Sequence, residues 1–523
     1  MTDQSTATAP PEHQPDRPRK PADASALSPL ELLRFAWTQL TSMRTALTLL
    51  FIAALAAIPG SLIPQRPVSP VQVREFITEN PRLGGFYDAV GLFEVYTSPW
   101  FSAIYLLLLV SLIGCIVPRI GVYARALRAE PVNTPRNLSR LPAYAKVDGR
   151  DDAIERATEH LRAKHYRVRR IEEDGATSLS AERGYLREAG NLVFHLSLVA
   201  MLLGVATGVL FGYRGAAIVP VGGGFSNNLT QYDELTSGAE FTDLDLQPFS
   251  VLIDDFTARF ETGKVNTGQP REFTANVTVI ERPGAEPKPD VIEVNHPLEI
   301  AGTQVHLLGH GYAPRVTVHD GEGNVAWSGP VVFLPQDGNF TSNGVIKAPD
   351  ARPDRLAFEG IFVPTTPVDN AMPRSLFPDA YNPELFLNAY HGPPRVATGE
   401  PENVYSLNKT GLTQYLQANG EPLRFRLKAG ESFALPDGRG TITYEGYQRW
   451  VRLQVSYTPG LAATLAACLI GVAGLCMSLF IRPRRLWVRA AADGSVEVTG
   501  LDRAEGRTGL AEAVGELGES VLR

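Results

Sequence analysis

Four long stretches without any Asp, Glu, Lys or Arg constrain this chain more than any other feature of its sequence. They run from Thr45 to Gln65, Val95 to Pro118, Ala189 to Tyr213 and Leu453 to Ile481. Each has at least the roughly 20 residues needed to cross a hydrocarbon core about 30 Å thick. A buried core helix could explain one such stretch, but four in one chain predict transmembrane helices. We place these helices at 45–65, 98–118, 189–212 and 459–481.

The basic residues outside these stretches predict the topology. Fifteen Lys and Arg residues lie between Arg119 and Arg187, but only three lie between Arg66 and Glu94. The positive-inside rule therefore places the loop 119–187 and both termini in the cytoplasm. The loops 66–97 and 213–456 are then extracytoplasmic. The acidic, Pro-rich N-terminus does not resemble a transit peptide, so we expect a bacterial cytoplasmic membrane.

Net charge and cysteine content exclude several classes of function. The 49 Lys and Arg against 56 Asp and Glu give a net charge of −7, and no basic block of domain size is present. Nucleic acid is therefore not an expected partner. The three cysteines all lie in the apolar stretches, which leaves no extramembrane pair for a disulfide or a thiolate metal site.

The N-terminal residues divide into two segments. Residues 1–27 are rich in Pro, Ala, Asp and Ser, a composition that cannot bury a core, and we expect them to be disordered. Ser28 opens a capping box with Glu31 and has Pro29 at the first helical position. An interfacial helix over 28–44 is the expected result.

The long loop 213–456 changes to short alternating runs broken by Gly, Pro, Asn and Asp. Such runs predict strands joined by hairpins, and we expect one β-sandwich or open β-barrel. Residues 349–422 differ, because many prolines and weak periodicity favour long loops with one short helix near Tyr381–Asn388.

The cytoplasmic loop and the C-terminal tail each contain strand and helix patterns but too few apolar residues for a core of their own. We expect the tail 482–523 to pack with residues 140–187 in one small α+β domain. The predicted class is an α+β membrane protein with four transmembrane helices, a large β-rich extracytoplasmic domain between the third and fourth helices, and this small cytoplasmic domain.

Histidine is the residue type left to carry chemistry, because phosphate-binding, zinc-protease and serine-hydrolase motifs are absent from the sequence. His195 lies inside the third apolar stretch, where an ionisable side chain is costly and usually faces a partner, a cavity or a cofactor. A hydrogen bond to a neighbouring helix or an approach to the interface would explain it, and so would axial ligation of haem iron. Gly204, Gly208 and Gly212 on the same stretch predict a close-packing face for this chain's own helices or for a partner.

Three histidines of the β-rich loop are weaker candidates. His296 lies in the segment VNHPL, where a solvated or strand-end histidine is the ordinary explanation. His306 and His310 would share one face of an extended strand and could form a metal site with His296.

Several segments together resemble the ResB family. ResB-like proteins belong to the cytochrome c biogenesis machinery called System II. They are LTLLFIAALAAIPGSLIPQ, GLFEVYTSPWFSAIYLLLLVSLIGC, GYLREAGNLVFHLSL, VNHPLEIAG and LQVSYTPG. They occur in order between about Ser42 and Trp487. The N-terminal 27 residues and the tail after Arg489 lie outside the resemblance.

The resemblance implies a membrane subunit of a cytochrome c synthetase, or haem lyase, that helps to move haem across the membrane and to present it with apocytochrome c for thioether formation. The implied partners are a CcsA/ResC-type membrane subunit, apocytochrome c, a ResA/CcsX-type thioredoxin-like reductase, a CcdA-type membrane protein and the lipid bilayer. The implied cofactor is haem b, bound transiently and shared with the partner subunit. His195 and His296 match histidines of the family and are the cofactor-binding candidates, and no catalytic residue is assigned.

Two other hypotheses about function remain open. A scaffold could bind apocytochrome and a thiol reductase without touching haem. An exported metal sensor could use His296, His306 and His310.

Overall fold

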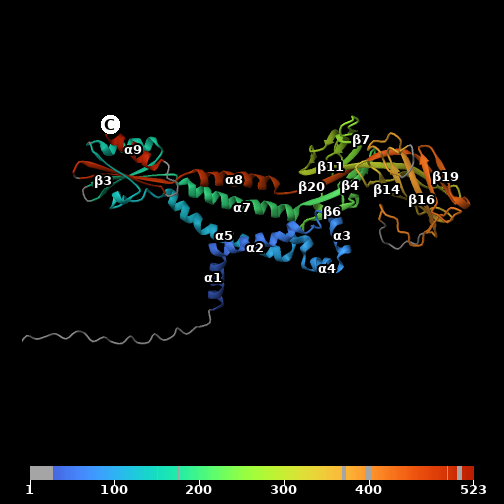
Figure 1. The fold of residues 1–523 in the computed structure, drawn as a ribbon, viewed down its shortest axis with the longest axis horizontal. Helices are drawn as coiled ribbons and strands as arrows, with labels where there is room; N and C mark the ends of the chain where they lie inside the picture. Colours follow the sequence, from blue (N-terminus) through green and yellow to red (C-terminus); the bar gives the residue numbers. More distant parts are fainter. Residues whose placement is uncertain are drawn as a thin grey trace, which may run out of the picture. The chain divides into compact units, whose positions relative to one another are not determined.

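The structure is a computed structural model that describes residues 28–149, 151–173, 176–367, 373–394, 403–491, 493–502 and 509–522 (Figure 1). The tail 1–27, for which disorder is expected, lies outside these residues. The chain divides into two compact units, residues 1–200 with 466–523, and residues 201–465.

Four helices in the described residues are long and apolar enough to cross a membrane. They are α2 (Met43–Leu62), α5 (Pro99–Arg128), α7 (Leu186–Phe211) and α8 (Leu461–Phe480). The hydroxyls of Ser42 and Ser98 cap α2 and α5 by accepting backbone N–H groups three residues further on. The presence in one chain of these membrane helices and of a large sheet-rich region confirms the predicted α+β class.

Helix α1 (Pro29–Leu40) precedes α2 and has the capping box read from the sequence. Glu31 N–H donates to Ser28 Oγ (3.4 Å), and Ser28 N–H donates to Glu31 Oε2 (2.9 Å). The break between α1 and α2 is held by α5, because Ser111 Oγ donates to Leu40 O (2.6 Å). The apolar side chains of α1 are exposed, as expected for a helix that lies at a lipid surface.

The segment between α2 and α5 is largely helical. It contains α3 (Pro70–Glu79), α4 (Pro81–Val90) and the 3₁₀ helix η1 (Leu92–Thr97). Arg66 fastens it by ion pairs to Asp88 (2.6 Å) and Glu94 (2.7 Å).

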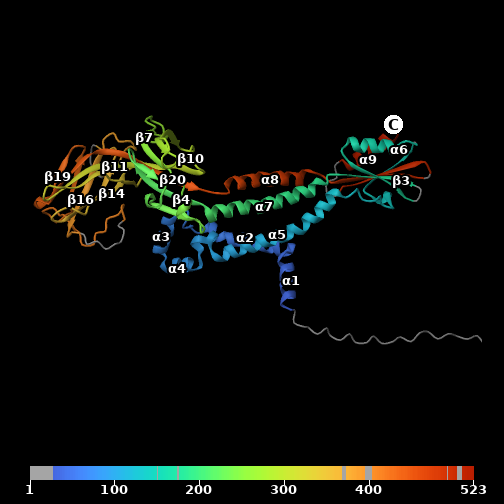
Figure 2. The same cartoon turned by 180° about the vertical axis from the view of Figure 1, so that it is seen from behind.

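The loop after α5 and the tail after α8 form one small α+β domain around a five-stranded antiparallel sheet of order β1-β22-β21-β3-β2. The strands are β1 (Ala143–Asp148), β2 (Arg167–Glu173), β3 (Ala176–Arg183), β21 (Arg484–Ala490) and β22 (Ser495–Asp502). Helices α6 (Ala153–Ala163) and α9 (Leu510–Leu522) lie against this sheet (Figure 2). The core of this domain contains Leu161, Leu179, Val498 and Leu517. The loop and the tail therefore each contribute apolar side chains to one shared core.

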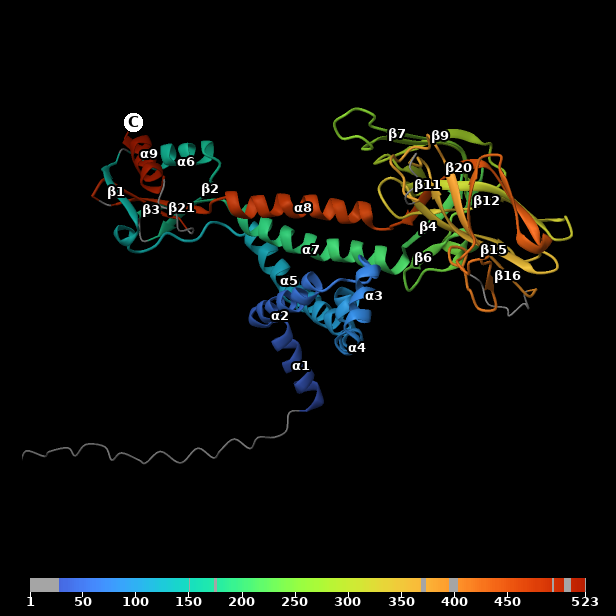
Figure 3. The same cartoon turned by 45° about the vertical axis from the view of Figure 1, so that its right-hand side comes forward.

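The described residues of the β-rich region form three antiparallel sheets (Figure 3). The seven-stranded sheet contains β4 (Tyr213–Pro220), β6 (Glu234–Ser237), β10 (Leu298–Ile300), β11 (Thr303–Asp320), β12 (Val325–Pro330), β19 (Ser432–Ala434) and β20 (Gly440–Tyr457). The four-stranded sheet contains β5 (Gly224–Ser226), β7 (Ser250–Phe260), β8 (Pro270–Ile280) and β9 (Lys288–Glu293). The six-stranded sheet contains β13 (Leu334–Pro335), β14 (Ser342–Ala348), β15 (Arg355–Val363), β16 (Glu384–Gly392), β17 (Thr413–Gln414) and β18 (Arg424–Lys428).

The expectation of one sandwich or barrel needs correction, because the described residues between β4 and β20 form two separate hydrophobic cores. Strands β11 and β20 pair along almost their whole length, and 18 residues of strand span about 60 Å. A single sandwich core is shorter than this pair of strands. Val305 of β11 therefore enters the core beside the four-stranded sheet, whereas Val318 enters the core beside the six-stranded sheet.

The short helix expected near Tyr381–Asn388 is also wrong, because residues 384–392 form strand β16. Leu385, Leu387 and Ala389 alternate into the second core, which is the period-two pattern of a strand. Strands β15 and β18 pair with β16 from its two sides. The pairing with these two strands, which are distant in sequence, outweighs the weak periodicity of the local sequence.

The glycines of α7 pack against α8 of the same chain. A Cβ at Gly204 would lie 2.4 Å from Thr464 Oγ1, and one at Gly208 would lie 3.2 Å from Pro459 O. Nearer the start of α7, Ser197 approaches Gly471, where an added Cβ would lie 2.5 Å from its Oγ. The close-packing face read from the sequence therefore serves this chain's own helices.

Candidate functional site

His195 is half-buried on α7, and its ring is oriented by its own helix. Nδ1 lies 2.8 Å from Asn191 O, one helical turn earlier. A carbonyl oxygen only accepts, so Nδ1 carries the proton in this hydrogen bond and Nε2 is left with its lone pair. The Phe194 ring packs edge-on against the imidazole, with 5.2 Å between ring centres.

This arrangement fits one axial ligand of haem iron. A ligating histidine usually donates its second ring N–H to a carbonyl or carboxylate, which fixes the tautomer and the orientation of the ring. In the described part of the chain, no hydrogen bond occupies Nε2 of His195. The imidazole thus presents a nitrogen lone pair from a largely apolar helix.

His296 belongs to the other unit, and its side chain is 79% exposed. It ends a tight turn after β9, in which His296 N–H donates to Glu293 O (3.1 Å) and Glu293 N–H donates to His296 O (3.2 Å). Asn295 takes the left-handed conformation within this turn (φ 67°). Nδ1 of His296 lies 3.8 Å from the Glu293 carboxylate, too long for a firm hydrogen bond. The imidazole is therefore accessible to a ligand in solution.

The metal site considered for His296, His306 and His310 is wrong. His306 pairs with Gln454 and His310 with Val451, because Leu308 forms a β-bulge between them. The extra residue puts the two imidazoles on opposite faces of the strand. Among the described residues, no three metal-ligating side chains are grouped for a metal ion.

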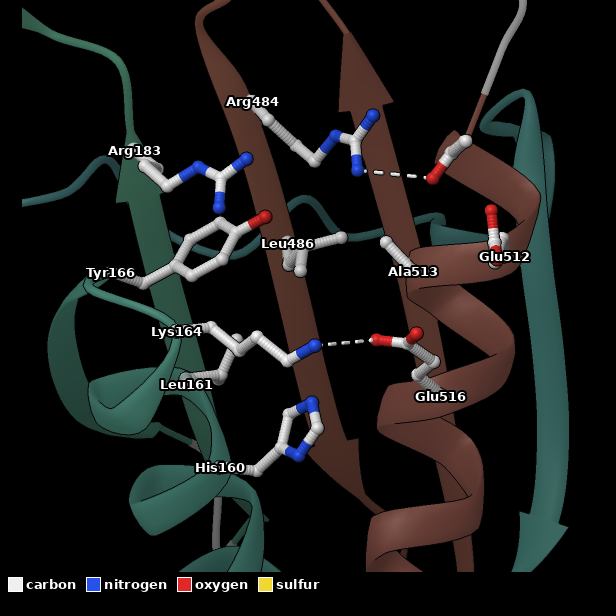
Figure 4. A pocket seen from close by; sticks show the side chains of 11 residues that line it. His160, Leu161, Lys164, Tyr166, Arg183, Arg484, Leu486, Glu512, Ala513 and Glu516 are labelled. Carbon is white, nitrogen blue, oxygen red and sulfur yellow. Dashed lines mark hydrogen bonds and ion pairs between the residues drawn. The ribbon is translucent and has the colours of Figure 1, made fainter.

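A cavity of about 270 Å³ lies in the small α+β domain between α6, β21 and α9 (Figure 4). Three of the charged side chains that line it form ion pairs. Lys164 contacts Glu516 (3.1 Å), and Arg484 binds both carboxylate oxygens of Asp502 (2.8 and 3.1 Å). These contacts hold the domain together, and we assign them a structural role.

The surroundings of His310 could not be found from the sequence. Phe256, Phe260, Phe273 and Phe340 lie around its ring, and they come from β7, β8 and the turn before β14. Arg449 of β20 lies on the same face of the sheet. Burial, with the positive charge of Arg449, lowers the pKa of His310 to about 3.

Comparison with known protein families gives one match that runs along most of the chain. The model of the ResB-like family matches residues 43–513. This chain belongs to the ResB-like family. The match covers all four membrane helices, the β-rich region and most of the small domain of this ResB-like protein.

Curated relatives of this ResB-like protein carry the name cytochrome c biogenesis protein CcsB. The protein from Thermosynechococcus vestitus is 28% identical over 52% of this chain and 60% of its own length. The one from Synechococcus sp. strain JA-2-3B'a(2-13) is 24% identical over 61% of this chain and 68% of its own length. The one from Nostoc sp. strain PCC 7120 is 28% identical over 52% and 57%. The chain thus spans about three fifths of the length of these relatives.

Proposed function

We propose that this protein acts in cytochrome c biogenesis as a membrane subunit that helps to carry haem b across the membrane and to present it to apocytochrome c. The orientation of His195 is the observation that supports this proposal most directly. Its Nδ1 proton is held by Asn191 O, which leaves Nε2 for iron. The names of the relatives support the same process.

In this proposal haem is the cargo, and His195 supplies one axial ligand. A CcsA/ResC-type subunit supplies the second ligand. His296, on an exposed turn of the β-rich region, then contacts haem as it is presented. The β-rich region faces the extracytoplasmic side, and both termini are cytoplasmic, as the distribution of basic residues favours.

Covalent attachment adds each apocytochrome thiol across a haem vinyl group. The sulfur bonds to one vinyl carbon, and the proton goes to the other. This addition needs reduced thiols and correct placement of the two reactants, and placement alone can supply much of a rate enhancement. A thioredoxin-like reductase would keep the thiols reduced, with electrons supplied by a CcdA-type membrane protein.

The test is covalent haem in a reporter apocytochrome, compared by haem stain among cells with this gene, without it, and with His195→Ala or His296→Ala. We expect loss of stain without the gene and with His195→Ala, while His306→Ala serves as the control histidine. Immunoblotting checks that each variant accumulates.

The purified complex separates haem handling from a haem-free scaffold. We expect the haem absorption of the complex to fall with His195→Ala. Stain that is lost without the gene but kept with both histidine variants, together with haem kept in the His195→Ala complex, would leave the scaffold as the explanation. Unchanged stain in cells without the gene would overturn the proposal.

A further inference from the structure

A second cavity lies where three membrane helices meet the small α+β domain. Its volume is about 240 Å³. The last turns of α5, the first turn of α7 and the segments that lead out of β3 and into β21 form its walls. All of these elements belong to the same compact unit of the chain. The cavity is therefore a feature of one folded unit, in which the membrane helices join the domain directly.

The ends of the uncharged stretches place this cavity at the level of the lipid headgroups. The stretch in α5 ends at Pro118, and Tyr123 lies five residues, or about 8 Å, further along the helix. Arg187 precedes the stretch of α7 by two residues, and Pro483 follows that of α8 by two. The headgroup layer is about 5–8 Å thick on each side of the hydrocarbon core. The cavity walls thus lie within or beside this layer.

Contacts within the protein already engage the carboxylates on the walls. Glu182 accepts from Arg485 Nη2 (3.2 Å). Glu130 pairs with Arg169 (2.9 Å), and Glu188 also has a partner. The two arginines neutralise the first two carboxylates, so these parts of the wall do not repel an anion.

Arg187 carries hydrogen-bond donors that the protein does not use. Its Nε donates to Ser478 O (3.3 Å), one of the last carbonyl groups of α8. In the part of the chain that the structure describes, neither Nη atom of Arg187 has a hydrogen bond or an ion pair. A guanidinium fixed in this way binds a phosphate through two parallel hydrogen bonds. Helix α7 begins at Leu186, so the positive end of its dipole also favours an anion here.

Two tyrosines add further donors to the same cavity. Tyr123 and Tyr185 line it, and neither hydroxyl has a hydrogen bond among the described residues. The Tyr185 ring lies 4.7 Å from the guanidinium carbon of Arg167, a contact that leaves the hydroxyl available. Tyrosine is enriched at the membrane interface because its ring is apolar and its hydroxyl is polar.

The charges around the cavity favour a lipid with a net negative charge. Arg119, Arg125 and Arg128 lie at the same end of α5, and all three are exposed. Arg482, which follows α8, is exposed as well. The sequence has no Asp or Glu between residues 119 and 129. Basic residues grouped at the end of a membrane helix attract anionic headgroups.

We propose that this cavity binds the headgroup of an anionic phospholipid. Both Nη groups of Arg187 donate to the phosphodiester oxygens, and the hydroxyls of Tyr123 and Tyr185 donate to oxygens of the same headgroup. The acyl chains remain in the bilayer beside the helices. The lipid joins the ends of α5 and α7 to the small domain, and its binding is independent of haem.

The test measures lipid bound to the full-length protein in detergent. Phosphatidylglycerol is titrated, and bound lipid is counted by native mass spectrometry. We expect Arg187→Gln to weaken binding about tenfold or more. The matched control is Arg125→Gln, because Arg125 also donates through Nε to a helix carbonyl, Gly121 O (3.2 Å), but does not line the cavity. Equal weakening by the two variants would overturn the site, because only general attraction would remain.

Tyr123→Phe tests the cavity without removing a charge. The variant loses one hydroxyl and keeps the ring, so the fold is preserved and lipid binding should weaken about threefold. Unchanged affinity with both Arg187→Gln and Tyr123→Phe would overturn the proposal.

Two competitors identify the source of the phosphate group. We expect that neither phosphatidylcholine nor soluble glycerol 3-phosphate displaces phosphatidylglycerol at equal concentration. Displacement by phosphatidylcholine would overturn the preference for an anionic lipid. Displacement by glycerol 3-phosphate would show a site for soluble phosphate compounds and would overturn the lipid assignment.

Discussion

At the scale of single residues, three histidines acquire different chemistry from their surroundings. His195 has one nitrogen tied to its own helix and one nitrogen available. His296 is on an exposed turn, and His310 is sealed among aromatic rings. The residue type is visible in the sequence, but the state of each nitrogen depends on contacts that form only on folding.

The acid sensitivity of the β-rich region should depend on His310. Its pKa is lowered to about 3 by burial and by Arg449, whereas an unfolded histidine titrates near 6.5. As the pH falls from about 6.5 toward 3, the unfolded chain takes up a proton that the folded chain refuses. The free energy of unfolding should therefore fall by about 1 kcal/mol per pH unit.

Thermal unfolding of the purified protein at pH 7 and pH 4.5, followed by circular dichroism, checks this expectation. His310→Leu should reduce the pH dependence, and His306→Leu serves as its control. An equal loss of stability in His310→Leu and the native chain would contradict the assignment.

At the scale of elements, close contact between backbones decides how the membrane helices pack. A Cβ at Gly474 of α8 would lie 2.8 Å from Phe194 N and 2.9 Å from Gly190 O. Both are backbone atoms, which cannot move aside as a side chain can. Small residues allow such approach in membranes, where burial of apolar surface does not drive helices together.

We expect Gly474→Ala to separate α7 from α8 locally and to cost about 1–3 kcal/mol by overpacking. Thermal unfolding in detergent measures the cost. Gly121→Ala in α5 is the matched control, because its Cβ would meet no atom within 4 Å. Equal unfolding temperatures for the two variants would show that the contact at Gly474 is not tight.

At the scale of the whole molecule, the small α+β domain joins segments separated by more than 250 residues. Arg485 of β21 donates to Glu182 of β3 (3.2 Å), and both side chains are largely buried. Lys164 and Glu516 also join the loop to the tail (Figure 4), but both side chains are about half exposed. The two ion pairs therefore differ mainly in burial.

We expect Arg485→Met to destabilise this domain by about 2 kcal/mol, because the Glu182 carboxylate loses its partner in a poorly solvated position. Lys164→Met should cost less than about 1 kcal/mol, since exposed ion pairs contribute little. Limited proteolysis of the full chain reports unfolding of this domain as cleavage within 130–183. A larger effect of Lys164→Met than of Arg485→Met would contradict the burial argument.

The sequence by itself determined the features that depend on local composition. Long uncharged stretches identify the membrane helices, and alternation identifies strands such as β11 and β7. These properties belong to consecutive residues and need no knowledge of distant partners. His195 was visible as a candidate for the same reason, because an ionisable residue in an apolar stretch is conspicuous wherever it points.

Only the tertiary structure decided what depends on partners far along the chain. The tail strands β21 and β22 lie between β1 and β3, which no local pattern specifies. Strand β16 exists because β15 and β18 pair with it, and one bulge at Leu308 separates His306 from His310. The aromatic rings around His310 of β11 likewise come from β7, β8 and the turn before β14. Pairing and packing between distant segments stabilise these features, so the features appear only when the chain is folded.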